Sequence, residues 1–251
     1  MSSMRSTERF SDRVADYVRA RPGYPPELAA FIAELHAPPA DVADVGSGTG
    51  ISTSMLLDAG YRVHAVEPNA AMRAAAEYVL DERAGFTSVS GTAEATGLPA
   101  ASFDLVTVGQ AFHWFDAPTA LAEFRRILRA EGWVVLFWNS RRLDSTPFLR
   151  GYEELLLRFG TDYAAVTERH SSAGPIDELF APSPVIARTF PNEQQLDYPG
   201  LEARLLSSSY VPVAGQLLHA PMLVALRELH EAHAVDGQVV IEYDMRVFAG
   251  R

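Results

Sequence analysis

Short apolar runs alternate with longer amphipathic stretches through the middle of the chain. Runs rich in β-branched or aromatic residues predict five strands, at 42–45, 62–66, 87–89, 103–108 and 133–138. The stretches between them predict helices at 51–59, 70–83 and 119–129, with Gly60 and Gly132 as stop signals. Strands that are apolar on both faces are typical of a parallel sheet covered by helices. The alternation therefore predicts repeated βα units in a doubly wound α/β fold.

The pattern changes after Asn139. The later residues predict helices at 147–159, 200–206 and 222–234, and strands at 185–190 and 238–248. Another helix is expected at about 11–19, before a Pro-rich break that starts at Arg21. Together these strands predict a seven-stranded, mainly parallel, Rossmann-like sheet. Its last strand is expected to be antiparallel and to lie at one edge, with helices inserted near the C-terminus.

The composition fits one large globular domain and argues against two classes of partner. The chain has 251 residues, of which 48% are hydrophobic, and its 32 acidic and 21 basic side chains give a net charge of −11. Nucleic acids and anionic membranes are bound through clustered basic residues, which this acidic sequence lacks. We therefore expect neither nucleic acid nor membrane as a partner, and no pattern predicts an oligomeric state.

Two residue types are missing, and each absence excludes some chemistry. The sequence contains no Cys, which excludes disulfides, thiolate nucleophiles and iron–sulfur clusters. It also contains no Lys, so all 21 basic residues are Arg, and Schiff-base catalysis, pyridoxal phosphate anchoring and a P-loop lack their amine. His230 and His233 share one helix face without a companion ligand, so no metal site is expected.

No targeting segment or membrane span is predicted. Residues 1–13 lack the apolar block of a signal peptide. The longest apolar run, at 133–138, is too short to span a bilayer. We therefore expect a cytoplasmic protein.

A glycine-rich turn follows the first predicted strand. It reads Gly46-Ser47-Gly48-Thr49-Gly50 and leads into a helix, an arrangement that brings exposed N–H groups and a helix N-terminus to a ligand. The dinucleotide fingerprint requires glycines at its first, third and sixth positions, and Ile51 occupies the sixth. An NAD(P)-dependent oxidoreductase is therefore the weaker alternative. A tighter turn around a ligand without a pyrophosphate is favoured.

Two carboxylates flank this turn. Asp44 ends an otherwise apolar strand and needs a partner, either a ligand amine or the N–H groups of the loop. Glu67 ends the second predicted strand, 19 residues after Gly48, where a carboxylate can accept hydrogen bonds from both hydroxyls of a ribose. The sequence thus predicts a nucleoside site at the carboxyl ends of the first two strands.

These residues resemble the class I S-adenosylmethionine-dependent methyltransferases. The resemblance is carried by 44–50, by Val66-Glu67-Pro68-Asn69 with Met72, and by 91–94, 98–99 and 102–106. Further similarity, at 21–25, 110–116 and 207–210, is to the small-molecule branch that includes trans-aconitate methyltransferase-like and ubiquinone-biosynthesis methyltransferase-like enzymes. The implied organisation is a single domain over 1–251, with an N-terminal helical lid (1–40), a cofactor-binding core (41–140), and substrate-side helices and edge strands (141–251).

The resemblance implies S-adenosylmethionine as the cofactor and a small molecule as the methyl acceptor. In such a site the glycines line the methionyl and ribose parts, Asp44 lies near the amino group, and Glu67 binds the ribose. Pro68 and Met72 enclose the adenine, for which a polarizable thioether is suited. The implied cofactor-binding residues are Arg21, Asp44, Gly46, Ser47, Gly48, Thr49, Gly50, Glu67, Pro68, Met72, Thr92, Ala93, Glu94 and Gln110.

The acceptor end of the site is predicted from aromatic and polar residues near strand ends. If the acceptor is a carboxylate, Arg21, Arg141 or Arg142 could hold it. Residues 109–112 lack the Asn/Asp-Pro-Pro-aromatic pattern of enzymes that methylate nucleic-acid bases, which also favours a small molecule. The candidate substrate-binding residues are Tyr17, Tyr24, His113, Trp114, Asn139 and Tyr210.

His113 is the candidate catalytic residue. It follows the fourth predicted strand at the ligand-binding end of the sheet, and an imidazole titrates near neutral pH. A protic acceptor needs such a general base, whereas a carboxylate does not. The alternative for His113 is a packing role beside Trp114 and Phe115. For the whole chain, the alternative is a protein that binds the cofactor without transferring methyl groups.

Overall fold

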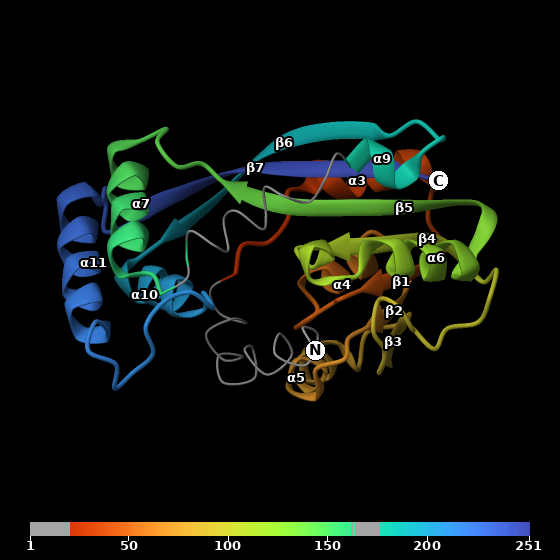
Figure 1. Cartoon of the computed structure of the whole chain (residues 1–251), viewed down its shortest axis with the longest axis horizontal. Helices are drawn as coiled ribbons and strands as arrows, with labels where there is room; N and C mark the ends of the chain where they lie inside the picture. Colours follow the sequence, from red (N-terminus) through yellow and green to blue (C-terminus); the bar gives the residue numbers. More distant parts are fainter. Residues whose placement is uncertain (1–20, 162, 164–175) are drawn as a thin grey trace.

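The computed structural model describes residues 21–161, 163 and 176–251 (Figure 1). The helix expected at about 11–19 and the candidate Tyr17 lie outside these residues. The described strands form one seven-stranded sheet in the order β3-β2-β1-β4-β5-β7-β6. They are β1 (Asp41–Val45), β2 (Arg62–Val66), β3 (Phe86–Val89), β4 (Phe103–Gly109), β5 (Leu128–Arg141), β6 (Ile186–Leu196) and β7 (Val239–Gly250).

The sheet confirms the predicted seven-stranded, mainly parallel arrangement. Strands β1 to β5 run parallel, and β7 is antiparallel to both of its neighbours. The final strand is antiparallel as expected, but it lies one position in from the edge, with β6 outside it. The burial pattern explains this order, because alternate residues of β7 are buried, whereas in β6 only Leu196 is.

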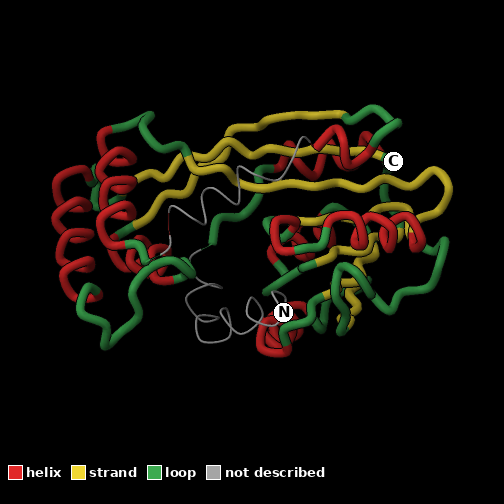
Figure 2. Tube along the Cα trace, in the orientation of Figure 1, coloured by secondary structure: helices red, strands yellow, loops and turns green. Residues whose placement is uncertain are grey.

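Helices cover both faces of the sheet, as Figure 2 shows, and β5 contributes to both layers. Val135 and Phe137 pack with α3 and α4, whereas Val134 and Leu136 pack with α6 and α9. This alternation is the two-residue period of a strand buried on both sides. The described α-helices are α3 (Pro26–Leu35), α4 (Ile51–Asp58), α5 (Ala70–Leu80), α6 (Ala117–Ile127), α7 (Pro147–Phe159), α9 (Ile176–Phe180), α10 (Tyr198–Leu206) and α11 (His219–His233).

Several elements differ from the sequence-based expectation. The strand expected at 133–138 extends over Leu128–Arg141, and the strand expected at 185–190 continues to Leu196. Gly132 is predicted to stop a helix, but α6 ends at Ile127 and Gly132 lies inside β5, beside a shift in the strand register. A Cβ at Gly132 would lie 3.0 Å from the carbonyl oxygen of Asp104, so the glycine allows close approach of two strands. The Pro-rich break leads directly into α3, a helix that the sequence pattern does not predict. Pro26 occupies the first position of this helix, where proline is favoured.

The helices α7, α10 and α11 form a separate packed group at one end of the molecule (Figure 1). There β5, β6 and β7 extend beyond the first four strands, and buried residues of the three helices pack on the ends of β6 and β7. None of the described helices is long and apolar enough to cross a membrane. The group places its side chains near the end of the sheet at which the glycine turn lies.

Candidate functional site

The glycine turn joins β1 to α4 in a backbone conformation that requires glycine. Gly46, Gly48 and Gly50 have φ angles of 70°, 57° and 87°, values that residues with a Cβ rarely adopt. A Cβ on Gly46 would lie 2.6 Å from the Cβ of Ala111, whereas the nearest atom to a Cβ on Gly48 is the Met72 Sδ, at 3.7 Å. The first glycine is therefore closely packed, and the middle of the turn is open.

Several N–H groups of this turn are used within the protein. Those of Gly46 and Ser47 donate to the carbonyl oxygen of Val66, at 2.8 and 3.2 Å, and that of Gly50 donates to the carbonyl oxygen of Ser47, at 3.0 Å. The prediction that the loop exposes its N–H groups to a ligand is wrong for these three residues. The turn instead offers a ligand the open backbone at Gly48, between the side chains of Ser47 and Thr49.

Asp44 lies fully buried beneath the turn. Its Oδ2 accepts hydrogen bonds from the hydroxyls of Ser52 and Thr53, both at 2.7 Å, and its Oδ1 accepts one from Thr107, at 2.9 Å. Burial raises the pKa of Asp44, and these hydroxyls oppose the rise. The expectation that the N–H groups of the loop satisfy this carboxylate is therefore wrong. Its partners are hydroxyls on α4 and β4, which come close only in the folded chain.

Glu67 follows β2 and links the glycine turn to the start of α5. Its Oε2 accepts a hydrogen bond from the N–H of Gly48 at 3.0 Å, and its Oε1 accepts one from the N–H of Asn69 at 2.8 Å. Burial raises the pKa of Glu67, although these N–H groups and the charge of Arg73 oppose the rise. A carboxylate has roughly four lone-pair positions. Each oxygen of Glu67 can therefore accept a further hydrogen bond from a ligand hydroxyl.

The residues expected to enclose an adenine lie next to this carboxylate. Pro68 is exposed, and Met72 is buried on the first turn of α5 with its sulfur toward Gly48. The side chain of Asn69 caps the helix by accepting hydrogen bonds from the N–H groups of Ala71 and Met72. The cap fixes the start of α5 and hence the position of the Met72 thioether.

The segment after β3, predicted at the adenine edge, is held by its own hydrogen bonds. The hydroxyl of Thr92 accepts one from the N–H of Ala95 at 3.2 Å. Ala93 is buried, and the carboxylate of Glu94 accepts a hydrogen bond from the N–H of Asp116 at 3.0 Å. These contacts fix the loop beside the sheet, and the adenine contact itself stays a prediction.

A pocket opens in front of the glycine turn. It is lined by the turn, by the segment before α3, by the end of β4 and by side chains from β5, β7 and α10. Of the predicted residues, it brings together Arg21, Tyr24, Gly46, Ser47, Gly48, Thr49, Gln110 and Asn139. Its remaining lining residues are Pro22, Ile51, Ser52, Gly109, Arg204 and Tyr243.

The segment before α3 is tied to elements from the other end of the chain. The carbonyl oxygen of Gly23 accepts hydrogen bonds from Asn139 at 3.2 Å and from Asn192 at 3.0 Å. The Nη2 of Arg21 donates to the carbonyl oxygen of Ser207 at 3.2 Å. This segment therefore connects one wall of the pocket to β5, β6 and the end of α10.

The end of β4 reaches the pocket through a strained residue. Gln110 has a φ angle of 60°, and its N–H donates to the carbonyl oxygen of Phe137 at 2.9 Å. A Cβ on the preceding Gly109 would lie 2.7 Å from the hydroxyl of Tyr24. Strained backbone of this kind is concentrated at ligand sites, because the surrounding structure must hold it in place.

Three predicted acceptor residues lie outside the lining of this pocket. His113 and Trp114 belong to the short helix η1 (Phe112–Trp114), and their ring centroids are 4.8 Å apart. Tyr210 packs in the group of α7, α10 and α11, with its ring centroid 5.0 Å from that of Tyr163. Their roles in catalysis and acceptor binding stay predictions.

Two of the lining residues that are not predicted as site residues come from late in the chain. Arg204 on α10 is 8% exposed, and Tyr243 on β7 is 1% exposed. The Nε of Arg204 donates to the Tyr243 hydroxyl at 3.3 Å. No local motif marks either residue, because only the packing of α10 and β7 brings them to the glycine turn.

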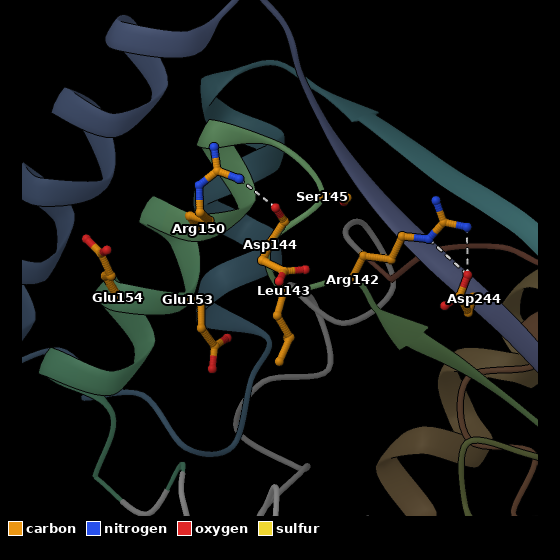
Figure 3. Close-up of a pocket in the computed structure, with 8 residues that line it drawn as sticks. All are labelled: Arg142, Leu143, Asp144, Ser145, Arg150, Glu153, Glu154 and Asp244. Atoms are coloured by element: carbon orange, nitrogen blue, oxygen red, sulfur yellow. Dashed lines mark hydrogen bonds and ion pairs between the residues drawn. The ribbon is translucent and has the colours of Figure 1, made fainter.

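A second pocket lies between the end of β5, α7 and β7, and Figure 3 shows its charged lining. Arg142 binds Asp244 at 2.7 Å, and Arg150 donates to the carbonyl oxygen of Asp144 at 2.6 Å. Such exposed pairs contribute little binding energy, and Arg142 does not line the glycine-turn pocket. No group of three or more His, Cys, Asp or Glu in the described part of the chain is arranged to hold a metal ion. We therefore place the functional site at the glycine turn.

Comparisons with known proteins identify relatives of this fold and site. A family model described as a methyltransferase domain matches residues 43–136. An uncharacterized methyltransferase of Mycobacterium tuberculosis is 39% identical over 151 residues, which cover 60% of this chain and 60% of the relative. Another, from Schizosaccharomyces pombe, is 34% identical over 155 residues, covering 59% and 58% of the two chains. A solved structure from Anaeromyxobacter dehalogenans, described as a candidate type II methyltransferase, matches with a TM-score of 0.70 and 25% identity over 92% of this chain and 97% of that one.

The sheet order, the glycine turn and the buried acid after β2 are typical of nucleoside-binding α/β proteins. The comparisons show that residues 43–136 match a methyltransferase domain and that the chain is similar to methyltransferases in sequence and in fold. The chain spans 60% of the length of the mycobacterial relative that it matches. The match to the family model includes the glycine turn.

Proposed function

We propose that the protein transfers a methyl group from S-adenosylmethionine to a diffusible small molecule. The observation that carries this proposal is the pocket that extends from the glycine turn to Asn139, Arg204 and Tyr243. One end is the glycine turn, whose Gly48 is adjacent to Glu67 and Met72, and the other end has polar side chains that can orient an acceptor. The net charge of −11 supports a small acceptor, because polyanionic substrates require a basic surface.

The residues at the glycine turn fit this cofactor. Glu67 retains acceptor positions for the two ribose hydroxyls, and the open middle of the turn leaves room where a side chain would otherwise lie. The buried thioether of Met72 offers a polarizable surface to an adenine ring. When bound, S-adenosylmethionine supplies an electrophilic methyl group on a positively charged sulfur.

The remaining chemistry belongs to residues that align the acceptor. Displacement at a methyl group requires the nucleophile to lie in line with the breaking bond, so positioning supplies much of the rate. Tyr24, Gln110 and Asn139 line the pocket that would hold the acceptor, and they are fixed by contacts with Phe137 and Gly23. His113 remains the candidate general base for a protic acceptor.

Two measurements test the proposal. Calorimetry with S-adenosylhomocysteine should detect binding, and a labelled methyl donor should give product with at least one class among carboxylic acids, phenols and amines. Binding without product from any class would favour a cofactor-binding sensor. Binding of NADH in place of S-adenosylhomocysteine would favour the oxidoreductase alternative.

A further inference from the structure

A buried arginine on α10 lacks an opposite charge among the described residues. Arg204 is 8% exposed, and its hydrogen bonds to the hydroxyls of Tyr243 and Ser208 are long, at 3.3 and 3.4 Å. It forms no ion pair with any residue in the described part of the chain. Burying a charge without a counterion is costly, and an arginine remains protonated at any physiological pH. The site is therefore arranged to gain free energy from a negatively charged ligand.

A second guanidinium, that of Arg141, shares the neighbour Tyr152 with Arg204. Arg141 lies over the ring of Tyr152, with its Cζ 5.1 Å from the ring centroid, and Tyr152 is also within electrostatic range of Arg204. The Nη2 of Arg141 pairs with Glu153. Its Nη1 is buried and has no hydrogen-bond partner within residues 21–161, 163 and 176–251. Two guanidinium groups and one carboxylate leave one positive charge in excess.

We propose that Arg204 binds a carboxylate of the methyl acceptor, a role that rests on the proposed function. Arg204 lines the same pocket as the glycine turn, so a group held by its guanidinium leaves the rest of the acceptor directed into that pocket. A guanidinium donates two parallel N–H bonds to a carboxylate, which fixes both position and orientation. Tyr243 holds the Nε side of Arg204. One excess positive charge matches a monoanionic carboxylate, whereas a dianionic phosphate would leave negative charge uncompensated.

Another carboxylate could occupy this position. The methionyl part of the cofactor carries one, and Arg21 lines the same pocket on the segment before α3. We assign Arg204 to the acceptor because it comes from the group of α7, α10 and α11, whereas the glycine turn joins β1 to α4. Its hydroxyl partners belong to β7 and to the segment after α10. The experiment must separate the two carboxylates.

The test uses the full chain saturated with S-adenosylhomocysteine and small acids paired with their neutral amides. Benzoate and benzamide, and succinate and succinamide, are titrated by ligand-observed nuclear magnetic resonance, with phenyl phosphate as the dianionic comparison. The variants are Arg204→Met, Arg204→Lys and, as a control for a surface charge, Arg142→Gln. We expect Arg204→Met to weaken binding of the acids about 10-fold to 100-fold. Arg204→Lys should fall between it and the wild type, and Arg142→Gln should match the wild type.

Several results would overturn the assignment. Equal binding of acids and amides to the wild type, or no binding of any acid, would contradict a carboxylate site. If Arg204→Met bound the acids as well as the wild type does, the carboxylate site would lie at another residue. If Arg204→Met weakens S-adenosylhomocysteine but not 5′-methylthioadenosine, which lacks the carboxylate, then Arg204 serves the cofactor.

Thermal unfolding separates a binding role from a structural one. Replacing an uncompensated buried charge by Met should leave the Tm unchanged or raise it. A large fall in Tm together with unchanged acid binding would make Arg204 a structural residue. If the wild type did not bind S-adenosylhomocysteine, the proposed function would be contradicted. If it bound S-adenosylhomocysteine but bound acids and amides equally well, only the Arg204 site would be contradicted.

Discussion

The two ends of the pocket are built in different ways. At the cofactor end, most contacts join residues close in sequence: Asp44 and Ser52 are 8 positions apart, and Gly48 and Glu67 are 19 apart. The hydrogen bond from Thr107 to Asp44, across 63 positions, is the exception among those described above. At the acceptor end, Arg204 and Tyr243 are 39 positions apart, and Asn139 and Gly23 are 116 apart. The cofactor end is thus built mainly from two consecutive βα units, with support from β4 and the residues after it, whereas the acceptor end is assembled from separate elements.

This difference has a functional consequence. Backbone geometry and two buried carboxylates define the cofactor end, so many positions there have little freedom to change. Side chains on α10, β5 and β7 define the acceptor end, and they can change without disturbing the glycine turn. A fold of this kind can retain one cofactor while its acceptor varies, because function resides in the site and not in the fold. Substitutions at each end test whether the two ends are separable.

The largest effect is expected at the first glycine of the turn. Gly46→Ala places a Cβ in the left-handed region and 2.6 Å from the Cβ of Ala111. Strain and overpacking together should lower the free energy of unfolding by about 2 to 5 kcal/mol. Gly97→Ala is the matched control, since Gly97 has a φ of 74° but an added Cβ there would have no atom within 4 Å. Urea unfolding measures the free energy of unfolding of both variants. If Gly46→Ala and Gly97→Ala lowered it equally, the explanation by overpacking would be contradicted.

A loss of cofactor affinity is expected at the acid after β2. Glu67→Gln should weaken S-adenosylhomocysteine by about 1 to 3 kcal/mol, because hydrogen bonds to a charged acceptor are replaced by weaker ones. Glu77→Gln is the control, since Glu77 lies on the neighbouring α5 and binds Ser88 away from the turn. Calorimetry on the two variants decides the result, and equal affinities would remove Glu67 from the cofactor site.

The pH dependence provides a second test of the same residue. Burial raises the pKa of Glu67 above its ordinary value of 4.5. Affinity for S-adenosylhomocysteine should therefore fall as the pH decreases through this raised pKa, and the profile of Glu67→Gln should be flatter. The folded state binds this proton more tightly than the unfolded chain does, so the contribution of Glu67 to stability falls as the pH rises through the raised pKa. If affinity varied with pH in the same way for the wild type and Glu67→Gln, the first expectation would be contradicted. If the free energy of unfolding did so, the second would be.

A smaller effect is expected from the hydroxyl that holds Arg204. Tyr243→Phe removes the oxygen that accepts from the Arg204 Nε, a hydrogen bond worth about 0.5 to 1.5 kcal/mol. The KM for a carboxylate acceptor should rise about 2-fold to 10-fold, with S-adenosylhomocysteine affinity unchanged. Steady-state kinetics and calorimetry on the same sample measure both quantities. A change in cofactor affinity alone would show that the two ends are not separable.

The smallest effect is expected at His113. It lies outside the lining of the glycine-turn pocket, with its ring against Trp114. For a carboxylate acceptor no proton must be removed, so His113→Gln should reduce the rate by less than about 10-fold with an unchanged pH profile. Loss of a general base typically costs about 100-fold to 10,000-fold. A loss in that range would establish His113 as the base and would argue for a protic acceptor.

The contrast between the two ends also explains what could be predicted from the sequence. The strand pattern predicts the parallel sheet, and the spacing of the glycines and Glu67 predicts the cofactor end, because each signal is local. The hydroxyl partners of Asp44 are not predicted, although Ser52 and Thr53 stand at the start of the next helix.

The acceptor end could not be predicted in the same way. Arg204 stands at an ordinary helical position, and its importance follows from burial without a counterion among the described residues, which depends on the packing of α10. Tyr210, in contrast, is predicted from its motif, but it packs among the helices away from the pocket lining. The order of the last two strands is not predicted either, because β7 lies between β5 and β6. The exposed residues of β6 fit an edge strand, which is evident only once β6 is seen to pair with β7.

Cofactor binding should belong to the glycine-turn end and be independent of the acceptor end. Titration of S-adenosylhomocysteine into Glu67→Gln and Arg204→Met, compared with the wild type, tests this separation most directly. We predict that Glu67→Gln binds about 5-fold to 150-fold more weakly, whereas Arg204→Met retains the wild-type affinity. Equal losses in both variants, or a loss in Arg204→Met alone, would contradict the separation of the two ends.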